Sequence, residues 1–139
     1  MQQFSNVLKE LNKWYQSFKW YPLLHSLELK LLFGGLGIVF IRELLYTILP
    51  YQAYRAMNVI FYTIPLNSLG YHAFLLGAWL TLASKNVRYL PYALWGYAFY
   101  IMFPFTSISL STIISTAVYA LLGYGVFRYS ASPYVDENR

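Results

Sequence analysis

Residues 27–49, LELKLLFGGLGIVFIRELLYTIL, decide the fold class of this chain. The stretch is predominantly apolar and stops at Pro50. A helix of this length is about 35 Å long, and the hydrocarbon core of a bilayer is roughly 30 Å thick. The stretch therefore predicts a transmembrane helix, and an all-α integral membrane protein.

The composition of the whole chain agrees with this prediction. Of its 139 residues, 58% are hydrophobic and 11% are charged, whereas about a quarter are charged in a typical soluble domain. So few charges cannot form the polar shell of a soluble domain, but a surface that faces lipid needs none. Tyr, Phe and Trp make up 21%, which is typical of anchoring at membrane–water interfaces. The length suits one membrane domain over 1–139.

Three further apolar stretches predict spans, at 66–84, 89–103 and 107–127. The stretch at 89–103 is short for a span, so thinning of the bilayer or protein neighbours must accommodate it. The segment 51–64 is too short and too polar to cross, because it carries Gln52, Arg55 and Asn58. We expect it to be a surface-lying or re-entrant connection.

The two ends of the chain have different patterns. In 1–21, apolar residues recur at the spacing of one helix face, with Lys largely off that face. This predicts an amphipathic helix in the headgroup plane; the alternative is a face that docks on a partner protein. Pro22 is expected to end this helix, and Ser26 to cap the first span. The end, 129–139, is predicted to be a loose polar tail.

The distribution of basic residues predicts the orientation. With four spans, one side of the membrane carries almost all of them: Lys9, Lys13, Lys19, Lys30, Lys85, Arg88 and Arg128. The opposite side carries only Arg55. Because Lys and Arg favour the cytoplasmic side, we expect both termini in the cytoplasm and a multi-pass protein of the plasma membrane.

A layer of polar residues is predicted in the outer third of the bilayer. Ionisable side chains within a span are costly and are candidates for function. The expected spans place six residues at similar depth: Arg42, Glu43, His72, Tyr100, Ser111 and Thr112. They could form a ligand or proton site, with Arg42 on an anionic headgroup. The alternative is structural, with Arg42 snorkelling to the interface, Glu43 in an ion pair with Arg42, Arg55 or His72, and His72 fixing helix packing.

Small residues recur every four positions on two of the predicted spans. They are Ala73, Gly77 and Thr81 on one, and Ser107, Ser111 and Ser115 on the other. Such stripes let helices approach closely, so we interpret them as packing seams. A hydroxyl-lined path for a solute is the alternative.

Enzymatic and nucleic-acid functions are not expected. The chain has no phosphate-binding glycine loop, no HExxH and no GxSxG motif, so no catalytic residue, metal ligand or cofactor is predicted. The absence of cysteine excludes disulfides and thiolate metal sites, and the basic residues form no continuous stripe for nucleic acid.

Two functional hypotheses follow from these patterns. The first is a non-enzymatic accessory or assembly subunit of a larger membrane complex, such as a transporter or envelope machinery, with the bilayer and other subunits, or itself, as partners. The alternative is a small transporter or lipid- or ion-binding homo-oligomer that uses the layer around Glu43 and His72.

Overall fold

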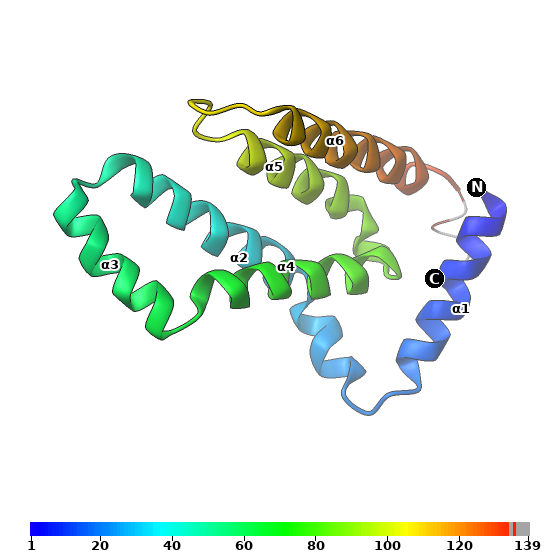
Figure 1. The fold of residues 1–139 in the computed structure, drawn as a ribbon. Helices are drawn as coiled ribbons and strands as arrows, with labels where there is room; N and C mark the ends of the chain where they lie inside the picture. The colour runs from blue at the N-terminus through cyan, green and yellow to red at the C-terminus, as the bar shows by residue number, and fades with distance from the viewer. Residues whose placement is uncertain (134, 136–139) are drawn as a thin grey trace.

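The structure is a computed structural model that describes residues 1–133 and 135. The described residues form helices and no strand, in the order α1 (Gln2–Gln16), α2 (Tyr21–Ile48), α3 (Tyr51–Thr63), α4 (Leu66–Leu82), the short 3₁₀ helix η1 (Lys85–Tyr89), α5 (Leu90–Met102) and α6 (Leu110–Ser130). Figure 1 shows α5 and α6 as a hairpin beside the α2–α4 pair, with α1 set apart at the other side. The all-α fold class is confirmed.

Two helices, α2 and α6, are long and apolar enough to cross a membrane. A third span is present if α3 and α4, which meet at an angle of 58°, are one broken span. On its own α4 is about 26 Å long and α5 about 20 Å, so each is shorter than a bilayer core. The structure thus has two or up to three candidate membrane spans, and the four-span arrangement stays a prediction.

The first long helix begins earlier than predicted, at Tyr21 instead of residue 27. Pro22 lies in its first turn, where the missing backbone N–H costs nothing and the fixed φ suits a helix. Ser26 is consequently inside the helix, and its hydroxyl donates to the carbonyl of Leu23 at 2.7 Å. The predicted N-cap at Ser26 is therefore wrong. The first helix does end before Pro22, but it stops at Gln16 and not at residue 21, and Pro22 belongs to the start of α2.

The last helix is shifted toward the C-terminus relative to the predicted 107–127. It begins at Leu110 because the hydroxyl of Ser109 accepts from the backbone N–H of Thr112 at 3.2 Å, which caps it. It ends at Ser130 and carries Tyr129, which is only 2% exposed. Of the predicted loose tail, Tyr129 and Val135 are thus packed, and residues 134 and 136–139 lie outside the described residues.

The connection at 51–64 is a helix, α3, bounded by Pro50 and Pro65. None of its residues is buried. In Figure 1 α3 joins the ends of α2 and α4 at the side of the molecule farthest from α1.

The α2–α4 pair packs through glycines. A Cβ on Gly77 of α4 would lie 2.7 Å from the Cα of Leu32, and one on Gly70 would lie 2.9 Å from the Cβ of Ile38. A Cβ on Gly35 of α2 would overlap the backbone of Phe74. The absence of these side chains lets the two backbones touch, which is how helices pack tightly within a bilayer.

The α5–α6 hairpin packs through an aromatic ring. The indole of Trp95 fills the space over Gly123, and its N–H donates to the carbonyl of Ala120 at 3.2 Å. Tyr97 and Tyr119 add an edge-to-face contact with ring centroids 4.7 Å apart. The main core, formed by Leu32, Phe74, Leu90, Ala93 and Leu94, joins this hairpin to α2 and α4.

The amphipathic helix α1 packs against the chain with part of its apolar face. Leu8 is buried with Val87, Tyr129 and Val135, and the ring of Phe4 meets that of Tyr129 with centroids 5.0 Å apart. Other apolar residues of α1 are exposed, among them Val7 and Trp14. The helix therefore uses one side for intramolecular packing and keeps apolar side chains for lipid or another surface.

Candidate functional site

Arg42 and Glu43 of the predicted layer lie together near the α3 end of α2. A guanidinium nitrogen of Arg42 is 3.5 Å from a carboxylate oxygen of Glu43, and both side chains are about a quarter exposed. Tyr100 of α5 lies within electrostatic range of both charges. The structure thus brings Arg42 and Glu43 into contact, with Tyr100 in their electrostatic surroundings.

Of the other three residues, His72 and Thr112 make contacts with residues near them in the chain, and Ser111 faces outward. Nδ1 of His72 donates to the carbonyl of Ser68 at 2.7 Å, and His72 makes no ion pair with Glu43. Thr112 belongs to the N-terminal cap of α6, where its hydroxyl is 2.9 Å from that of Ser109. Ser111 is exposed. Nothing joins these residues to Glu43, so a single site over the whole layer stays a hypothesis.

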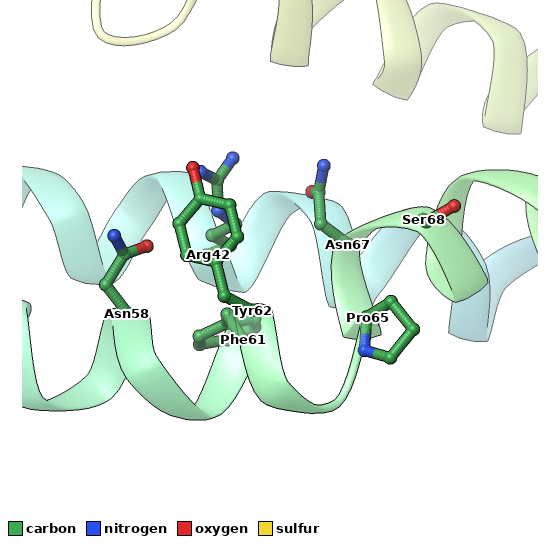
Figure 2. Close-up of a pocket in the computed structure, with 7 residues that line it drawn as sticks. All are labelled: Arg42, Asn58, Phe61, Tyr62, Pro65, Asn67 and Ser68. Atoms are coloured by element: carbon green, nitrogen blue, oxygen red, sulfur yellow. The ribbon is translucent and has the colours of Figure 1, made fainter.

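A pocket of about 220 Å³ with mixed polar and apolar walls opens beside Arg42, between α2, α3 and the start of α4. It is lined by Arg42, Asn58, Phe61, Tyr62, Pro65, Asn67 and Ser68. Figure 2 shows the guanidinium of Arg42, the hydroxyl of Tyr62 and the amide of Asn67 pointing to the same side. The amide oxygen of Asn67 is buried and has no hydrogen-bond partner. The pocket therefore gathers one cation and several neutral polar groups at the end of a membrane helix.

The small-residue stripes fall in two different environments. On α4, Gly77 touches α2 as described, and the buried hydroxyl of Thr81 donates to the carbonyl of Gly77. Ala73 is half-buried on the same helix. In the other stripe Ser107 and Ser111 are exposed and Ser115 is half-buried. Contacts of these three serines with another helix stay a prediction, because α6 meets α5 through Tyr119 and Gly123.

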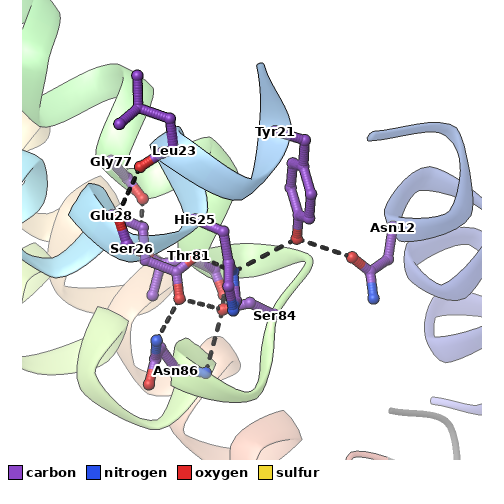
Figure 3. A network of polar contacts seen from close by, with 10 residues as sticks. All are labelled: Asn12, Tyr21, Leu23, His25, Ser26, Glu28, Gly77, Thr81, Ser84 and Asn86. Atoms are coloured by element: carbon purple, nitrogen blue, oxygen red, sulfur yellow. Dashed lines mark hydrogen bonds and ion pairs between the residues drawn. The ribbon is translucent and has the colours of Figure 1, made fainter. Parts of the chain in front are cut away.

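A second polar cluster, at the opposite end of α2, was not predicted as a site. Glu28 is only 1% exposed. One of its carboxylate oxygens, Oε1, accepts from the hydroxyl of Ser84 at 2.8 Å and from the side-chain amide of Asn86. The other oxygen, Oε2, lies 3.2 Å from Nδ1 of His25 and has no hydrogen bond. Figure 3 shows the groups converging from α2 and from the turn between α4 and η1.

The cluster continues to α1 through Tyr21. The hydroxyl of Tyr21 donates to the amide oxygen of Asn12 at 3.0 Å and lies 3.5 Å from Nδ1 of His25 (Figure 3). A pocket of about 360 Å³ opens here. The i, i+3 spacing of His25 and Glu28 was a local signal that sequence reasoning did not use. The hydrogen-bond donors to Glu28 could not be found in this way, because Ser84 and Asn86 are 56 and 58 residues away in the chain.

Two groups of α1, outside the spans, have shifted pKa values. The hydrogen bond from Lys13 and the charge of Lys13 lower the pKa of Glu10, the ammonium and the carboxylate being 2.8 Å apart. Partial burial raises the pKa of Tyr15, whose ring stacks on Tyr21. In the described part of the chain, no group of three or more His, Cys, Asp or Glu residues is arranged to hold a metal ion.

Comparison with known proteins finds no matching family model, no matching curated protein and no matching solved structure. The function is therefore argued from the geometry alone.

Proposed function

We propose that this chain is a non-enzymatic, four-span protein of the plasma membrane that binds a phosphate-bearing anionic lipid headgroup in the Arg42 pocket. The observation that carries the proposal is the position of the Arg42 guanidinium. It lies partly buried in a pocket with mixed polar and apolar walls near the end of a candidate membrane helix, with its one ionic partner in the described residues at 3.5 Å.

The chemistry of the pocket favours a phosphate group. Arginine is always charged and presents several N–H donors in a plane, a geometry that suits phosphate oxygens. The amides of Asn58 and Asn67 and the hydroxyl of Ser68 offer neutral donors around it. A headgroup in the pocket would leave its acyl chains beside α2 and α3, in the bilayer.

The fold is compatible with four spans and cytoplasmic termini. The contact of Glu28 with Ser84 brings the start of α2 beside the end of α4, where η1 and α5 also begin. Contacts of Leu8 and Phe4 with Tyr129 add α1 and the end of α6 to this side. Seven basic residues therefore belong to one end of the molecule, which supports assigning that end to the cytoplasm.

Headgroup binding is tested with purified protein by native mass spectrometry and in nanodiscs. We expect phosphatidylglycerol to be retained over phosphatidylcholine, and Arg42→Gln to weaken that retention about tenfold, as for the loss of one charge-assisted contact. Arg55→Gln is the matched control, because Arg55 is an exposed arginine on α3 outside the pocket. Equal retention by wild type and Arg42→Gln protein would disprove the proposal.

Glu43 supplies a second, opposite test. Its carboxylate competes with a bound phosphate for the guanidinium, so Glu43→Gln should strengthen retention of the anionic lipid. Weaker retention with Glu43→Gln would show that Glu43 positions Arg42 and does not compete for it.

The second candidate function is that of an accessory subunit, and uncovered small residues favour it. A Cβ on Gly34, Gly37 or Gly125 would meet nothing within 4 Å. Small residues on an open helix face allow another membrane helix to approach closely. The mass of the complex released from native membranes by a mild detergent tests this. Other polypeptides in fixed ratio, lost with Gly125→Leu, would support an accessory role, and a lone chain would count against it.

A further inference from the structure

The Glu28 cluster opens into a pocket with an unusual combination of charges. The pocket, of about 360 Å³, has a polar lining from three segments of the chain, which includes Asn12, Gln16, Tyr21, His25, Lys85 and Asn86. Lys85 is exposed and makes no ion pair in the described residues, while the carboxylate of Glu28 is buried behind His25. One side of the pocket therefore offers the ammonium of Lys85, and the other offers the imidazole of His25 with the carboxylate of Glu28 behind it.

The carboxylate of Glu28 has an unfilled place for a donor. Its Oε2 is fully enclosed and accepts no hydrogen bond, although a buried acceptor without a partner costs about 1–3 kcal/mol. The group between this oxygen and the pocket is the imidazole of His25, whose side chain is 49% exposed. A ligand in the pocket therefore meets the imidazole of His25, and the carboxylate of Glu28 acts on the ligand from behind this ring.

The two neighbours of Nδ1 favour one tautomer of the His25 ring. Tyr21 gives its hydroxyl hydrogen to Asn12, so its oxygen faces Nδ1 of His25 as an acceptor. Oε2 of Glu28, on the other side of Nδ1, is an acceptor as well. These two neighbours favour the tautomer with its hydrogen on Nδ1, and in that neutral ring Nε2 is left with a lone pair. The Glu28–His25 pair is thus an acceptor for a primary ammonium group.

We propose that this pocket binds a zwitterionic group made of a phosphate and a primary ammonium, of the kind found in an ethanolamine phospholipid headgroup. Lys85 binds the phosphate, and the Glu28–His25 pair accepts from the ammonium. The site lies at the opposite end of α2 from the Arg42 pocket and selects a different headgroup, because a buried carboxylate disfavours a purely anionic ligand. A trimethylammonium group has no N–H to donate, so a choline headgroup is the chemical control.

The experiment compares phospholipids with matched acyl chains on purified protein by native mass spectrometry. We expect the wild type to retain phosphatidylethanolamine about tenfold better than phosphatidylcholine. His25→Phe should abolish this preference and leave retention of phosphatidylcholine unchanged. Phe places a somewhat larger aromatic ring against Tyr21, on which His25 stacks with centroids 5.5 Å apart, so the variant keeps an aromatic side chain and removes both nitrogen atoms. Glu28→Gln is a second test of the preference, provided that the purified variant is folded.

The phosphate side of the pocket has its own variants. Lys85→Gln should weaken retention of both lipids by a similar factor, and Lys30→Gln, an exposed lysine outside the pocket, should change neither. Arg42→Gln should also leave the ethanolamine preference intact, which separates this site from the Arg42 pocket. Equal effects of Lys85→Gln and Lys30→Gln would overturn the assignment of Lys85.

A soluble probe distinguishes a phospholipid from a free phosphoethanolamine compound as the ligand, since both carry a phosphate and a primary ammonium. Displacement of the lipid by glycerophosphoethanolamine, and not by glycerophosphocholine, would support recognition of the headgroup itself from either source. If neither displaces a lipid that still shows the ethanolamine preference, the ligand is the lipid. Equal retention of ethanolamine and choline lipids by the wild type, or a preference that survives His25→Phe, would overturn the proposal.

Discussion

The two ends of α2 both carry charged side chains, but the partners of these charges differ in their distance along the chain. At one end Arg42 and Glu43 are neighbours in sequence, partly exposed, and 3.5 Å apart. At the other end Glu28 is buried and bonded to Ser84 and Asn86, which are 56 and 58 residues away. The Arg42–Glu43 pair leaves the guanidinium of Arg42 open to a pocket. The hydrogen bonds of Glu28 instead tie α2 to the segment that follows α4.

This difference shows what a charge near a membrane helix end can do. A partly exposed ion pair adds about 0–1 kcal/mol to stability, so Arg42 is available for a ligand at little cost. A buried carboxylate is stable only when donors surround it, so the Glu28 cluster constrains the fold as well as offering a site. Stability and binding should therefore respond differently at the two ends.

The largest loss of stability is expected from disruption of the α2–α4 packing, on which both ends of α2 depend. Gly77→Leu places a side chain against the backbone of Leu32 and should destabilise the α2–α4 pair by about 3 kcal/mol or more. Both pockets would then be lost together. The free energy of unfolding, measured by denaturation of the purified protein in SDS, tests this. Gly37→Leu is the control, since a Cβ there meets nothing within 4 Å, and equal destabilisation by both variants would contradict the packing account.

Loss of an asparagine side chain should cost more stability at the Glu28 end of α2 than at the Arg42 end. Asn86→Ala removes a donor from the buried carboxylate of Glu28 and should lower the free energy of unfolding by about 1–3 kcal/mol. Asn58→Ala, at the Arg42 pocket, should cost less than about 1 kcal/mol, because the partner of Asn58, the hydroxyl of Tyr54, is 3.4 Å away. Equal costs, measured in the same denaturation assay, would mean that the Glu28 cluster does not tie the helices together.

The attachment of α1 is expected to depend on Tyr21. Tyr21→Phe keeps the ring but removes the hydrogen bond to Asn12, so it should weaken docking of α1 by about 0.5–1.5 kcal/mol. Hydrogen exchange of the α1 amides is the measurement. Tyr54→Phe, which removes a longer contact on α3, is the control. Tyr21→Phe should raise hydrogen exchange in α1 more than Tyr54→Phe does. If the two variants have equal effects, the apolar contacts around Leu8 are sufficient to hold α1 in place.

The smallest change in stability is expected for Arg42→Gln, below about 1 kcal/mol. The variant should nevertheless weaken retention of the anionic lipid about tenfold. A large loss of stability with this variant would make Arg42 a structural residue and would remove the contrast between the two ends.

Prediction from sequence succeeded where the signal was local. The all-α class, the helices around residues 27–49 and 107–127, and the break near Pro22 all follow from runs of apolar residues and from proline. Helix starts were less accurate, as at Ser26, because a proline in the first turn and a serine cap compete as start signals. The closeness of Arg42 and Glu43 could be anticipated, since adjacent residues cannot be far apart.

The sequence by itself determined that the chain is helical and that some of its helices are apolar enough to cross a membrane, and it predicts basic residues on one side of four spans. Only the tertiary structure decided which polar residues meet. His72 is hydrogen-bonded to Ser68 of its own helix, while Glu28 is hydrogen-bonded to Ser84 and Asn86, which follow α4. The physical reason is that helix formation depends on neighbours three or four residues apart. The partners of a buried charge depend instead on how closely two backbones can approach, which Gly35, Gly70 and Gly77 set here.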